Sequence, residues 1–149
     1  MELVTRVTNL TTTNLNYKVM EANELMIGDW VYRPDCYDKV KEIRQNGIIG
    51  LDNLRGLIGF SEIKPIPLTP EILEKNGFEK ALQISDTEPF DTDEEGNKHY
   101  SYNKTFWGWY QQDNIFCIPA NGMGWLYIKY VHQLQHALRL CKIEKEIIL

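Results

Sequence analysis

Two histidines four residues apart are the first candidates for chemistry in this chain. His132 and His136 have the spacing at which two imidazoles on successive turns of a helix can hold a metal ion. A zinc site needs a third and a fourth ligand, and no nearby cysteine or aspartate has the spacing to supply them. The residues between them also lack the glutamate that follows the first histidine in zinc proteases. We therefore expect a polar helix face here, with no metal and no other cofactor bound.

A run of acids at residues 91–97 is similar to the first half of a calcium-binding loop. Acids stand at positions 1, 3 and 5 of the run, and Gly96 stands at position 6. Position 12 is Tyr102 instead of the bidentate glutamate of such loops, and no helix is expected on either side. A solvated hairpin loop is the simpler interpretation of this run.

The three cysteines, Cys36, Cys117 and Cys141, are an odd number and have no CxxC spacing. Their pattern speaks against a disulfide framework or a zinc knuckle, and it fits reduced thiols in a cytoplasmic protein. Cys117 or Cys141 could form a nucleophile–base pair with His99 or His132. Cys117 lies in an apolar run, however, and Cys141 falls on the apolar side of a predicted helix, so we expect both to pack in the core. No phosphate-binding loop or serine-hydrolase motif occurs in the chain either, and we predict no catalytic residue.

Large aromatic residues cluster on two predicted strands between residues 99 and 131. Tyr100, Tyr102 and Phe106 fall on one parity of the first strand, and Trp107 and Trp109 fall on the other. Aromatic residues on both parities of a strand mean either burial on both faces or one exposed aromatic surface. We favour burial in the core, whereas an exposed patch would mark a partner site or a stacking platform for bases or sugars. Together with three polar residues of the following helix, they make up the candidate partner contacts: Trp107, Trp109, Trp125, Tyr127, His132, Gln133 and His136.

The net charge of −5 over 149 residues is unevenly placed. Nine acids and three bases fall within residues 71–100, which leaves the rest of the chain close to neutral. No stripe of lysine and arginine occurs, and non-specific binding of nucleic acid depends on such a basic face. Nucleic acid is therefore the less favoured partner, and the acidic stretch is expected to be a solvated surface.

The overall composition is that of a folded globular protein, with 43% apolar and 25% charged residues. The longest apolar runs fall far short of the roughly 18 residues that a membrane span needs. The first residues show no basic start followed by an apolar block, so no secretory signal is expected. We predict a cytoplasmic protein that makes no membrane contact.

The chain divides into an irregular N-terminal arm at residues 1–19 and a single α+β domain at residues 20–149. The arm is rich in threonine and asparagine and has no sustained period. Residues 20–66 predict a β-rich lobe, in which Asn46-Gly47 gives the strongest hairpin signal. Short strands punctuated by glycine favour a small curled or SH3-like sheet there. They are expected at residues 25–32, 39–44, 48–51 and 56–60.

Residues 67–149 predict a helix, an antiparallel meander and a second helix. Two prolines make residues 63–68 an extended linker instead of a central strand. Thr69 is expected to cap a short helix that begins at Pro70, and Gly77 is expected in the left-handed position just after its end.

The meander and the elements after it follow from the spacing of apolar residues and turn signals. The apolar residues of the second helix fall within one arc of about 120°, so this helix is expected to pack on the sheet. The acidic loop occupies residues 86–98. Strands are expected at residues 81–84, 99–110, 115–118 and 125–131, turns at 113–114 and 121–122, the second helix at 131–142, and a last short strand at 144–149.

Three segments carry a resemblance to a known family: ELMIGDWV at residues 24–31, IPLTPEILEKNGF at 66–78 and YVHQLQ at 130–135. In this order they resemble a family of small uncharacterised proteins of gut anaerobic bacteria, their prophages and mobile elements. The resemblance implies no reaction; it implies a cytosolic accessory protein of phage or mobile-element origin. Family members tend to begin just before the first segment, so we expect Met20 to be the native initiator.

The sequence as a whole favours a non-enzymatic interaction module that binds a protein partner. The first alternative is a nucleic-acid-associated accessory factor, which the SH3-like lobe, the aromatic residues and the resemblance support and the charge opposes. The second alternative is an enzyme of unknown class that uses His132, His136 or the acidic loop.

Overall fold

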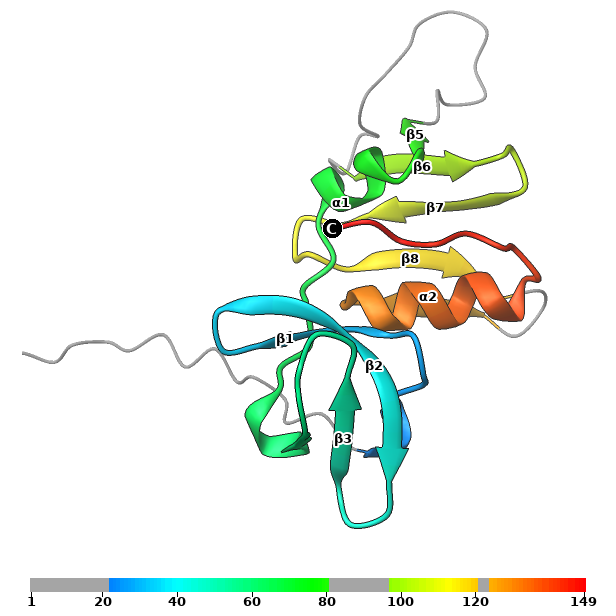
Figure 1. Ribbon diagram of the computed structural model, residues 1–149. Helices are drawn as coiled ribbons and strands as arrows, with labels where there is room; N and C mark the ends of the chain where they lie inside the picture. The colour runs from blue at the N-terminus through cyan, green and yellow to red at the C-terminus, as the bar shows by residue number, and fades with distance from the viewer. Residues whose placement is uncertain (1–21, 81–96, 121–123) are drawn as a thin grey trace, which may run out of the picture.

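Two antiparallel sheets, each with its own hydrophobic core, make up this protein in a computed structural model (Figure 1). The structure describes residues 22–80, 97–120 and 124–149. Among them are two α-helices, so the α+β class predicted from the sequence is confirmed. We call residues 22–64 the N-terminal lobe and the described residues from Ile66 onward the C-terminal lobe.

The sheet of the N-terminal lobe is a four-stranded meander in the order β1-β2-β3-β4. A 3-10 turn, η1 (Ala22–Glu24), precedes the sheet, and a second one, η2 (Phe60–Glu62), follows it. The expected strand at 25–32 begins later than predicted, because residues 25–29 form a turn. The strands are β1 (Trp30–Arg33), β2 (Cys36–Arg44), β3 (Ile48–Leu51) and β4 (Leu57–Gly59).

The hairpin predicted at Asn46-Gly47 is confirmed. Asn46 has a φ of 74° and Gly47 a φ of 71°, which are the two positive values that a tight hairpin turn of this hand needs. Behind the turn, one face of the sheet buries a small apolar cluster. Its members are Leu25, Val31, Val40, Ile49, Leu51, Phe60 and Ile63.

The short helix α1 (Pro70–Lys75) begins and ends as the sequence predicts. The hydroxyl of Thr69 accepts a hydrogen bond from the backbone N–H of Ile72 at 3.4 Å. At the other end, Gly77 has a φ of 80° and the N–H of Phe78 donates to the carbonyl of Leu73 at 3.1 Å, which closes the helix in a Schellman pattern.

The sheet of the C-terminal lobe has five strands in the order β5-β6-β7-β8-β9. Helix α2 (Val131–Leu140), α1 and the C-terminal tail lie on one face of this sheet (Figure 1). The apolar side of α2 packs into the core of this lobe, as its periodicity predicts. The strands are β5 (Glu79–Lys80), β6 (Lys98–Tyr102), β7 (Phe106–Tyr110), β8 (Phe116–Pro119) and β9 (Trp125–Ile128).

The single strand expected at 99–110 is wrong, because the chain reverses in the middle of it. Asn103 and Lys104 have φ values of 50° and 58° and form the turn between β6 and β7. Lysine seldom adopts positive φ, so its presence hides the turn from sequence reasoning. The predicted separation of the aromatic residues still holds: Tyr100 and Phe106 face the core and Trp107 faces away from it.

The C-terminal tail is another departure from expectation. Residues 144–149 form no strand, yet Ile147 is fully buried in the core of the C-terminal lobe. Asn76 fixes the tail: its amide oxygen accepts from the N–H of Ile148 and its amide nitrogen donates to the carbonyl of Ile148, both at 2.8 Å. Cys141 is exposed just after α2, which corrects the prediction that it packs in the core.

Some expected features lie outside the described residues. They are the arm at 1–19 with the expected initiator Met20, the strand at 81–84, residues 86–96 of the acidic loop with nearly all of its calcium-like run, and the turn at 121–122.

Candidate functional site

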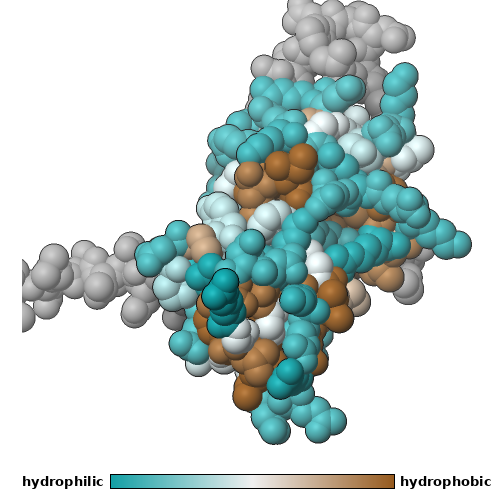
Figure 2. Space-filling model, viewed as in Figure 1, coloured by the Kyte–Doolittle hydropathy of each residue, from teal (hydrophilic) through white to brown (hydrophobic). Residues whose placement is uncertain are grey.

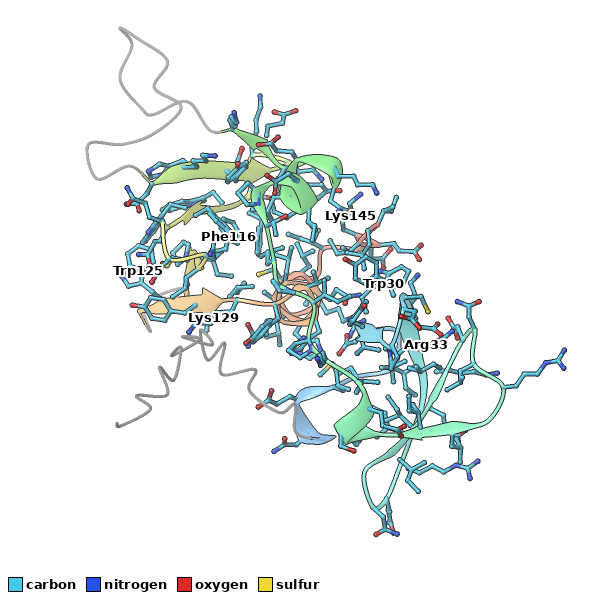
Figure 3. The ribbon with its side chains drawn as sticks, turned by 90° about the vertical axis from the view of Figure 1, so that its left-hand side faces the viewer. Trp30, Arg33, Phe116, Trp125, Lys129 and Lys145 are labelled. Carbon is cyan, nitrogen blue, oxygen red and sulfur yellow. The ribbon has the colours of Figure 1, made fainter. Side chains whose placement is uncertain are left out.

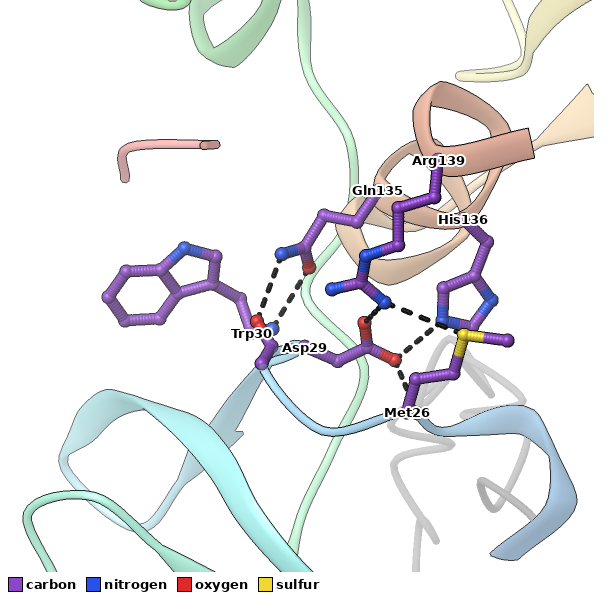
Figure 4. Close-up of polar contacts among 7 residues, drawn as sticks. Met26, Asp29, Trp30, Gln135, His136 and Arg139 are labelled. Atoms are coloured by element: carbon purple, nitrogen blue, oxygen red, sulfur yellow. Dashed lines mark hydrogen bonds and ion pairs between the residues drawn. The ribbon is translucent and has the colours of Figure 1, made fainter. Parts of the chain in front are cut away.

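The fully buried carboxylate of Asp29 joins the two lobes (Figure 4). One oxygen accepts from the backbone N–H of Met26 at 2.7 Å and lies 2.6 Å from Nε2 of His136. The other oxygen accepts from Nη1 of Arg139 at 3.1 Å. Because a buried carboxylate needs partners, two side chains of α2 hold the turn before β1 against the helix. We call this set of contacts the lobe junction.

Gln135 extends the lobe junction by acting as a strand partner. Its amide oxygen accepts from the backbone N–H of Trp30 at 3.0 Å, and its amide nitrogen donates to the carbonyl of Gly28 at 3.1 Å (Figure 4). A buried side chain on α2 thus satisfies two backbone groups that would otherwise be left without a partner at the start of β1.

The indole of Trp30 reaches from β1 into the core of the C-terminal lobe. Its Nε1 donates to the carbonyl of Ile147 at 2.7 Å. Nζ of Lys39 lies 4.8 Å from the centre of the indole ring and also pairs with the carboxylate of Glu146. The N-terminal lobe, α2 and the C-terminal tail therefore meet around Trp30.

The extended segment that follows the N-terminal lobe is hydrogen-bonded to the start of α2 within the C-terminal lobe. The N–H of Leu68 donates to the carbonyl of Lys129 at 2.8 Å, and the N–H of Val131 donates to the carbonyl of Ile66 at 2.9 Å. The three segments at 24–31, 66–78 and 130–135 that carry the family resemblance are thus neighbours in space, joined by backbone and side-chain hydrogen bonds.

The prediction of a solvated polar helix face at His132 and His136 is wrong for His132, because this side chain is buried. Its ring stacks on Tyr130 at 5.8 Å between centroids and lies edge-on to the ring of His136 at the same distance. Gln133 caps the helix, since its amide oxygen accepts from the N–H groups of Lys129 and Tyr130. These polar side chains hold the structure together instead of forming a solvated face.

The described residues contain no group of three or more histidine, cysteine or acidic side chains that could hold a metal ion. Cys117 is buried, and its burial, with the charge of Asp113 adding, raises the pKa of its thiol. A raised pKa keeps the sulfur protonated and poorly nucleophilic. The expectation that Cys117 packs inside the protein is confirmed.

The aromatic residues form a surface, which overturns the interpretation that they fill the core. Trp107 is 45% exposed, Trp125 47% and Tyr127 60%. With the half-buried Trp109 they lie on the sheet face turned away from α2, and we call these four residues the aromatic face. The ring centroids of Trp109 and Trp125 are 4.4 Å apart, and those of Trp107 and Trp109 are 6.4 Å apart. Figure 3 shows Trp125 at the outer side of the sheet, while Phe116 of the adjoining strand points inward.

Gly108 explains how two tryptophans can flank one position on β7. A Cβ atom at Gly108 would stand 2.4 Å from the carbonyl oxygen of Cys117 and 2.8 Å from side-chain atoms of Phe116 and Ile118. The strands approach too closely for any side chain there. The core side of β7 at Gly108 is therefore filled by its neighbours, and the tryptophans on either side face outward.

The structure divides the seven candidate residues between the two sides of the sheet. The four aromatic ones gather on the aromatic face, and His132, Gln133 and His136 lie on α2 at the opposite side. The sequence reasoning missed Asp29, Gln135 and Arg139, which make the lobe junction. A single signal for Asp29 was present, because an acid between Gly28 and Trp30 in an otherwise apolar segment is out of place unless it is paired.

The side of the molecule that carries the helices differs from the aromatic face in its surface residues. Figure 2 shows mostly hydrophilic residues there, with separate hydrophobic areas between them. A groove of about 800 Å³ opens between the lobes, and it is lined by both bases and acids, including Lys142, Lys145, Glu144 and Glu146. Mixed charges give this groove no single preference for a ligand.

Comparison with protein-family models, with curated proteins and with solved structures found no match to this chain. None of the helices in the described residues has the length and apolar character needed to cross a membrane. The geometry of the site therefore carries the functional argument by itself.

Proposed function

We propose that this protein is a non-enzymatic interaction module that binds a protein partner through its aromatic face. The observation that carries the proposal is the exposure of Trp107, Trp125 and Tyr127 side by side on one face of a sheet. Contiguous exposed aromatic residues are uncommon on a monomeric surface, and tryptophan and tyrosine are the residues that dominate binding energy in protein interfaces.

The lobe junction supports a binding role more than a catalytic one. Asp29, His136 and Arg139 lie together, and each is engaged in holding one lobe on the other. A rigid junction positions the sheet that carries the aromatic face. Arg139 is the member of this set that lines the groove between the lobes, and its guanidinium is already paired with Asp29.

A nucleic-acid-associated role is the second candidate, because exposed aromatic side chains are also platforms on which bases stack. Lys129 follows β9 on the same side of the sheet and would face a phosphate. The net charge of −5 opposes this role, since affinity for single strands depends on a positively charged groove. The protein-binding role is therefore the one we favour.

The family resemblance adds a setting to this proposal. It implies a cytosolic accessory protein of phage or mobile-element origin and no reaction, which fits a non-enzymatic role with either a protein or a nucleic-acid partner. The SH3-like description of the N-terminal lobe belongs to the same proposal and rests on its short, curled four-stranded meander.

Affinity capture with matched variants tests the proposed function. Immobilised wild-type protein, a Trp107→Ala/Trp125→Ala double variant and a Tyr37→Ala control are exposed to the same host lysate. Tyr37 is 52% exposed on the N-terminal lobe, so it controls for the loss of an exposed aromatic ring elsewhere. We expect a protein that the wild type and the control retain and the double variant loses. Equal retention by all three proteins contradicts the proposal.

A fluorescence titration tests the second candidate. Quenching of tryptophan fluorescence by a single-stranded oligonucleotide that weakens at higher salt would favour the nucleic-acid role. No salt-sensitive quenching discards it.

A further inference from the structure

Strand β9 forms one edge of the sheet in the C-terminal lobe. It pairs with β8 on one side, with Phe116 opposite Ile128 and Pro119 opposite Trp125. In the part of the chain that the structure describes, no strand pairs with its other side over Trp125–Ile128. A free edge presents backbone N–H and C=O groups to any extended chain that can reach them.

The linker shows which backbone groups of this edge point outward. Just after β9, the carbonyl of Lys129 accepts from Leu68 and the N–H of Val131 donates to Ile66, so Pro67 and Tyr130 form an antiparallel bridge. Backbone groups alternate in direction along a strand. The groups of Tyr127 and Trp125 therefore point to the same side as those of Lys129. An extended segment of this chain already uses the edge up to Leu68, where Thr69 diverts the chain into α1.

The side chains of β9 leave both of its faces open to a further strand. Trp125 and Tyr127 are exposed on the aromatic face, and Leu126 is 44% exposed on the other. Proteins usually protect an edge strand with a charge, a proline or a bulge. Residues 125–128 contain none of these, and the pairing with β8 is regular along their length.

A second copy of this chain would bury too little surface at this edge to form a specific dimer. An aromatic side chain buries about 150–250 Å² when it is fully covered, so the exposed parts of Trp125, Leu126 and Tyr127 amount to about 300 Å² per copy. Two copies would bury about 600 Å², below the roughly 1,000 Å² of a specific interface. A bound peptide strand gains the same main-chain hydrogen bonds as a second copy would, without the repulsion between two chains that each carry a net charge of −5.

The charges around the edge indicate the character of the peptide. Lys129 follows β9 directly and lies near Trp125 (Figure 3), whereas Glu79, an acidic strand residue on the same side of the sheet, lies on β5 at the opposite edge. A carboxylate on the added strand would face Lys129, whereas a basic residue would be repelled. The strand residues on this side of the sheet are Glu79, His99, Ser101, Trp107, Trp109, the buried Cys117, Pro119, Trp125 and Tyr127.

From these observations we propose that β9 binds an extended, acidic segment of a partner protein, which adds to the sheet as a sixth strand. This inference rests on the proposed function, because it names how the partner of the aromatic face is held. The outward backbone groups of Trp125 and Tyr127 provide the affinity, and their rings with Leu126 provide the apolar contacts on the two faces.

A probe peptide tests the strand addition directly. The probe is an acetylated eight-residue peptide of alternating valine and threonine that ends in two aspartates, and amide hydrogen exchange of the intact protein is followed by NMR. We expect exchange at Trp125 and Tyr127 to slow by about tenfold or more when the peptide is bound. An analogue with N-methyl groups on alternate residues should lose this protection, and an analogue that ends in two lysines should bind several-fold more weakly. Unchanged exchange at both residues with the aspartate peptide overturns the inference.

Edge variants separate this inference from the proposed function. Leu126→Lys places a charge on the edge, while Leu57→Lys is the matched control on β4, an edge strand of the other sheet with similar exposure. We expect Leu126→Lys to abolish peptide protection and Leu57→Lys to leave it intact. If capture of the lysate partner depends on Trp107 but not on Leu126, strand addition is wrong and the proposed function stands. Concentration-dependent dimers in sedimentation that Leu126→Lys abolishes assign the edge to a second copy and also overturn the inference.

Discussion

The carboxylate of Asp29 and the imidazole of His136 are 2.6 Å apart although 107 positions separate them in the chain. Asp29 belongs to the turn before β1 and His136 to α2, so this contact joins the first sheet to the helix that covers the second. Arg139 one turn further along α2 binds the other oxygen of the same carboxylate. This pair is central to the lobe junction, so losing it should weaken the contact between the two lobes.

Replacing Asp29 by asparagine should destabilise the protein more than any exposed acid would. The substitution removes the buried carboxylate that binds Arg139 and His136, and a hydrogen bond to a charged group contributes about 1.5–3 kcal/mol. We expect the free energy of unfolding of Asp29→Asn, measured by urea denaturation, to fall by about that amount. Asp52→Asn, at an exposed position, is the control and should change it by less than about 0.5 kcal/mol. A loss for Asp29→Asn as small as that of the control contradicts the role given to the junction.

Asn76→Ala should release the C-terminal tail. The buried amide of Asn76 binds both backbone groups of Ile148 as well as the carbonyl of Ile72. Each buried partner left unsatisfied costs about 1–3 kcal/mol. We expect a clear fall in thermal stability and faster amide exchange at Ile148, whereas Asn23→Ala, at an exposed position, should have neither effect. Unchanged exchange at Ile148 would show that the tail is held by other contacts.

Gly108→Ala should be among the most damaging small substitutions in the sheet. The added methyl group would meet the carbonyl oxygen of Cys117 at 2.4 Å, so β7 and β8 must move apart. Overpacking of this kind costs about 1–3 kcal/mol or more. Gly59→Ala is a matched control, because Gly59 also lies in a strand and its added Cβ would meet ordinary contacts at 3.5 Å. Chemical denaturation should rank the two variants in this order, and equal stabilities would be inconsistent with the close approach of the strands.

The three cysteines should differ in their reaction with an alkylating agent. Cys141 is exposed, Cys36 is half-buried and Cys117 is buried with a raised pKa. Since the thiolate is the reactive form, Cys141 should be labelled first and Cys117 only when the protein unfolds. Mass spectrometry of the labelled protein at increasing times measures this order. Rapid labelling of Cys117 in the native protein would contradict its placement beneath the aromatic face.

Stability should fall in alkaline solution because of Tyr100. Burial, and then the hydrogen bond to Glu74 at 2.9 Å, raise the pKa of its phenol above the ordinary value of 10.0. A raised pKa in the folded state means that the contribution to stability is complete below pH 10 and is lost as the pH rises toward the folded pKa. The free energy of unfolding should therefore decline above about pH 10, and less steeply in Tyr100→Phe. If the free energy of unfolding declines equally with pH in the wild type and in Tyr100→Phe, Tyr100 is not the cause of the decline.

Local features of the fold could be predicted from the sequence, and contacts across the chain could not. The turn at Asn46-Gly47 and the ends of α1 at Thr69 and Gly77 follow from the conformations that single residues prefer. The turn at Asn103 and Lys104 was missed because tertiary pairing of β6 with β7 imposes a conformation that lysine seldom adopts. The position of Asp29 between Gly28 and Trp30 signals that its carboxylate needs a partner, but that His136 is the partner depends on how the two sheets are placed.

The aromatic face, too, could be predicted from the sequence only in part. Alternation correctly separated Trp107 and Trp109 from Tyr100 and Phe106, because side chains of a strand alternate between faces. Which of the two faces is buried depends on where α1, α2 and the tail lie, and these elements are all on the side of Tyr100. The larger aromatic residues were therefore assigned to the core by their hydrophobicity and found on the surface.

The central claim, that the aromatic face binds the partner, is tested most directly by NMR of the protein labelled with 5-fluorotryptophan. The four tryptophans report from two places, since Trp30 lies in the lobe junction and Trp107, Trp109 and Trp125 lie on the aromatic face. On addition of the captured partner, we predict that the resonances of Trp107 and Trp125 shift or broaden and that of Trp30 does not. Unchanged resonances of Trp107 and Trp125 in a sample that contains the complex would contradict the claim.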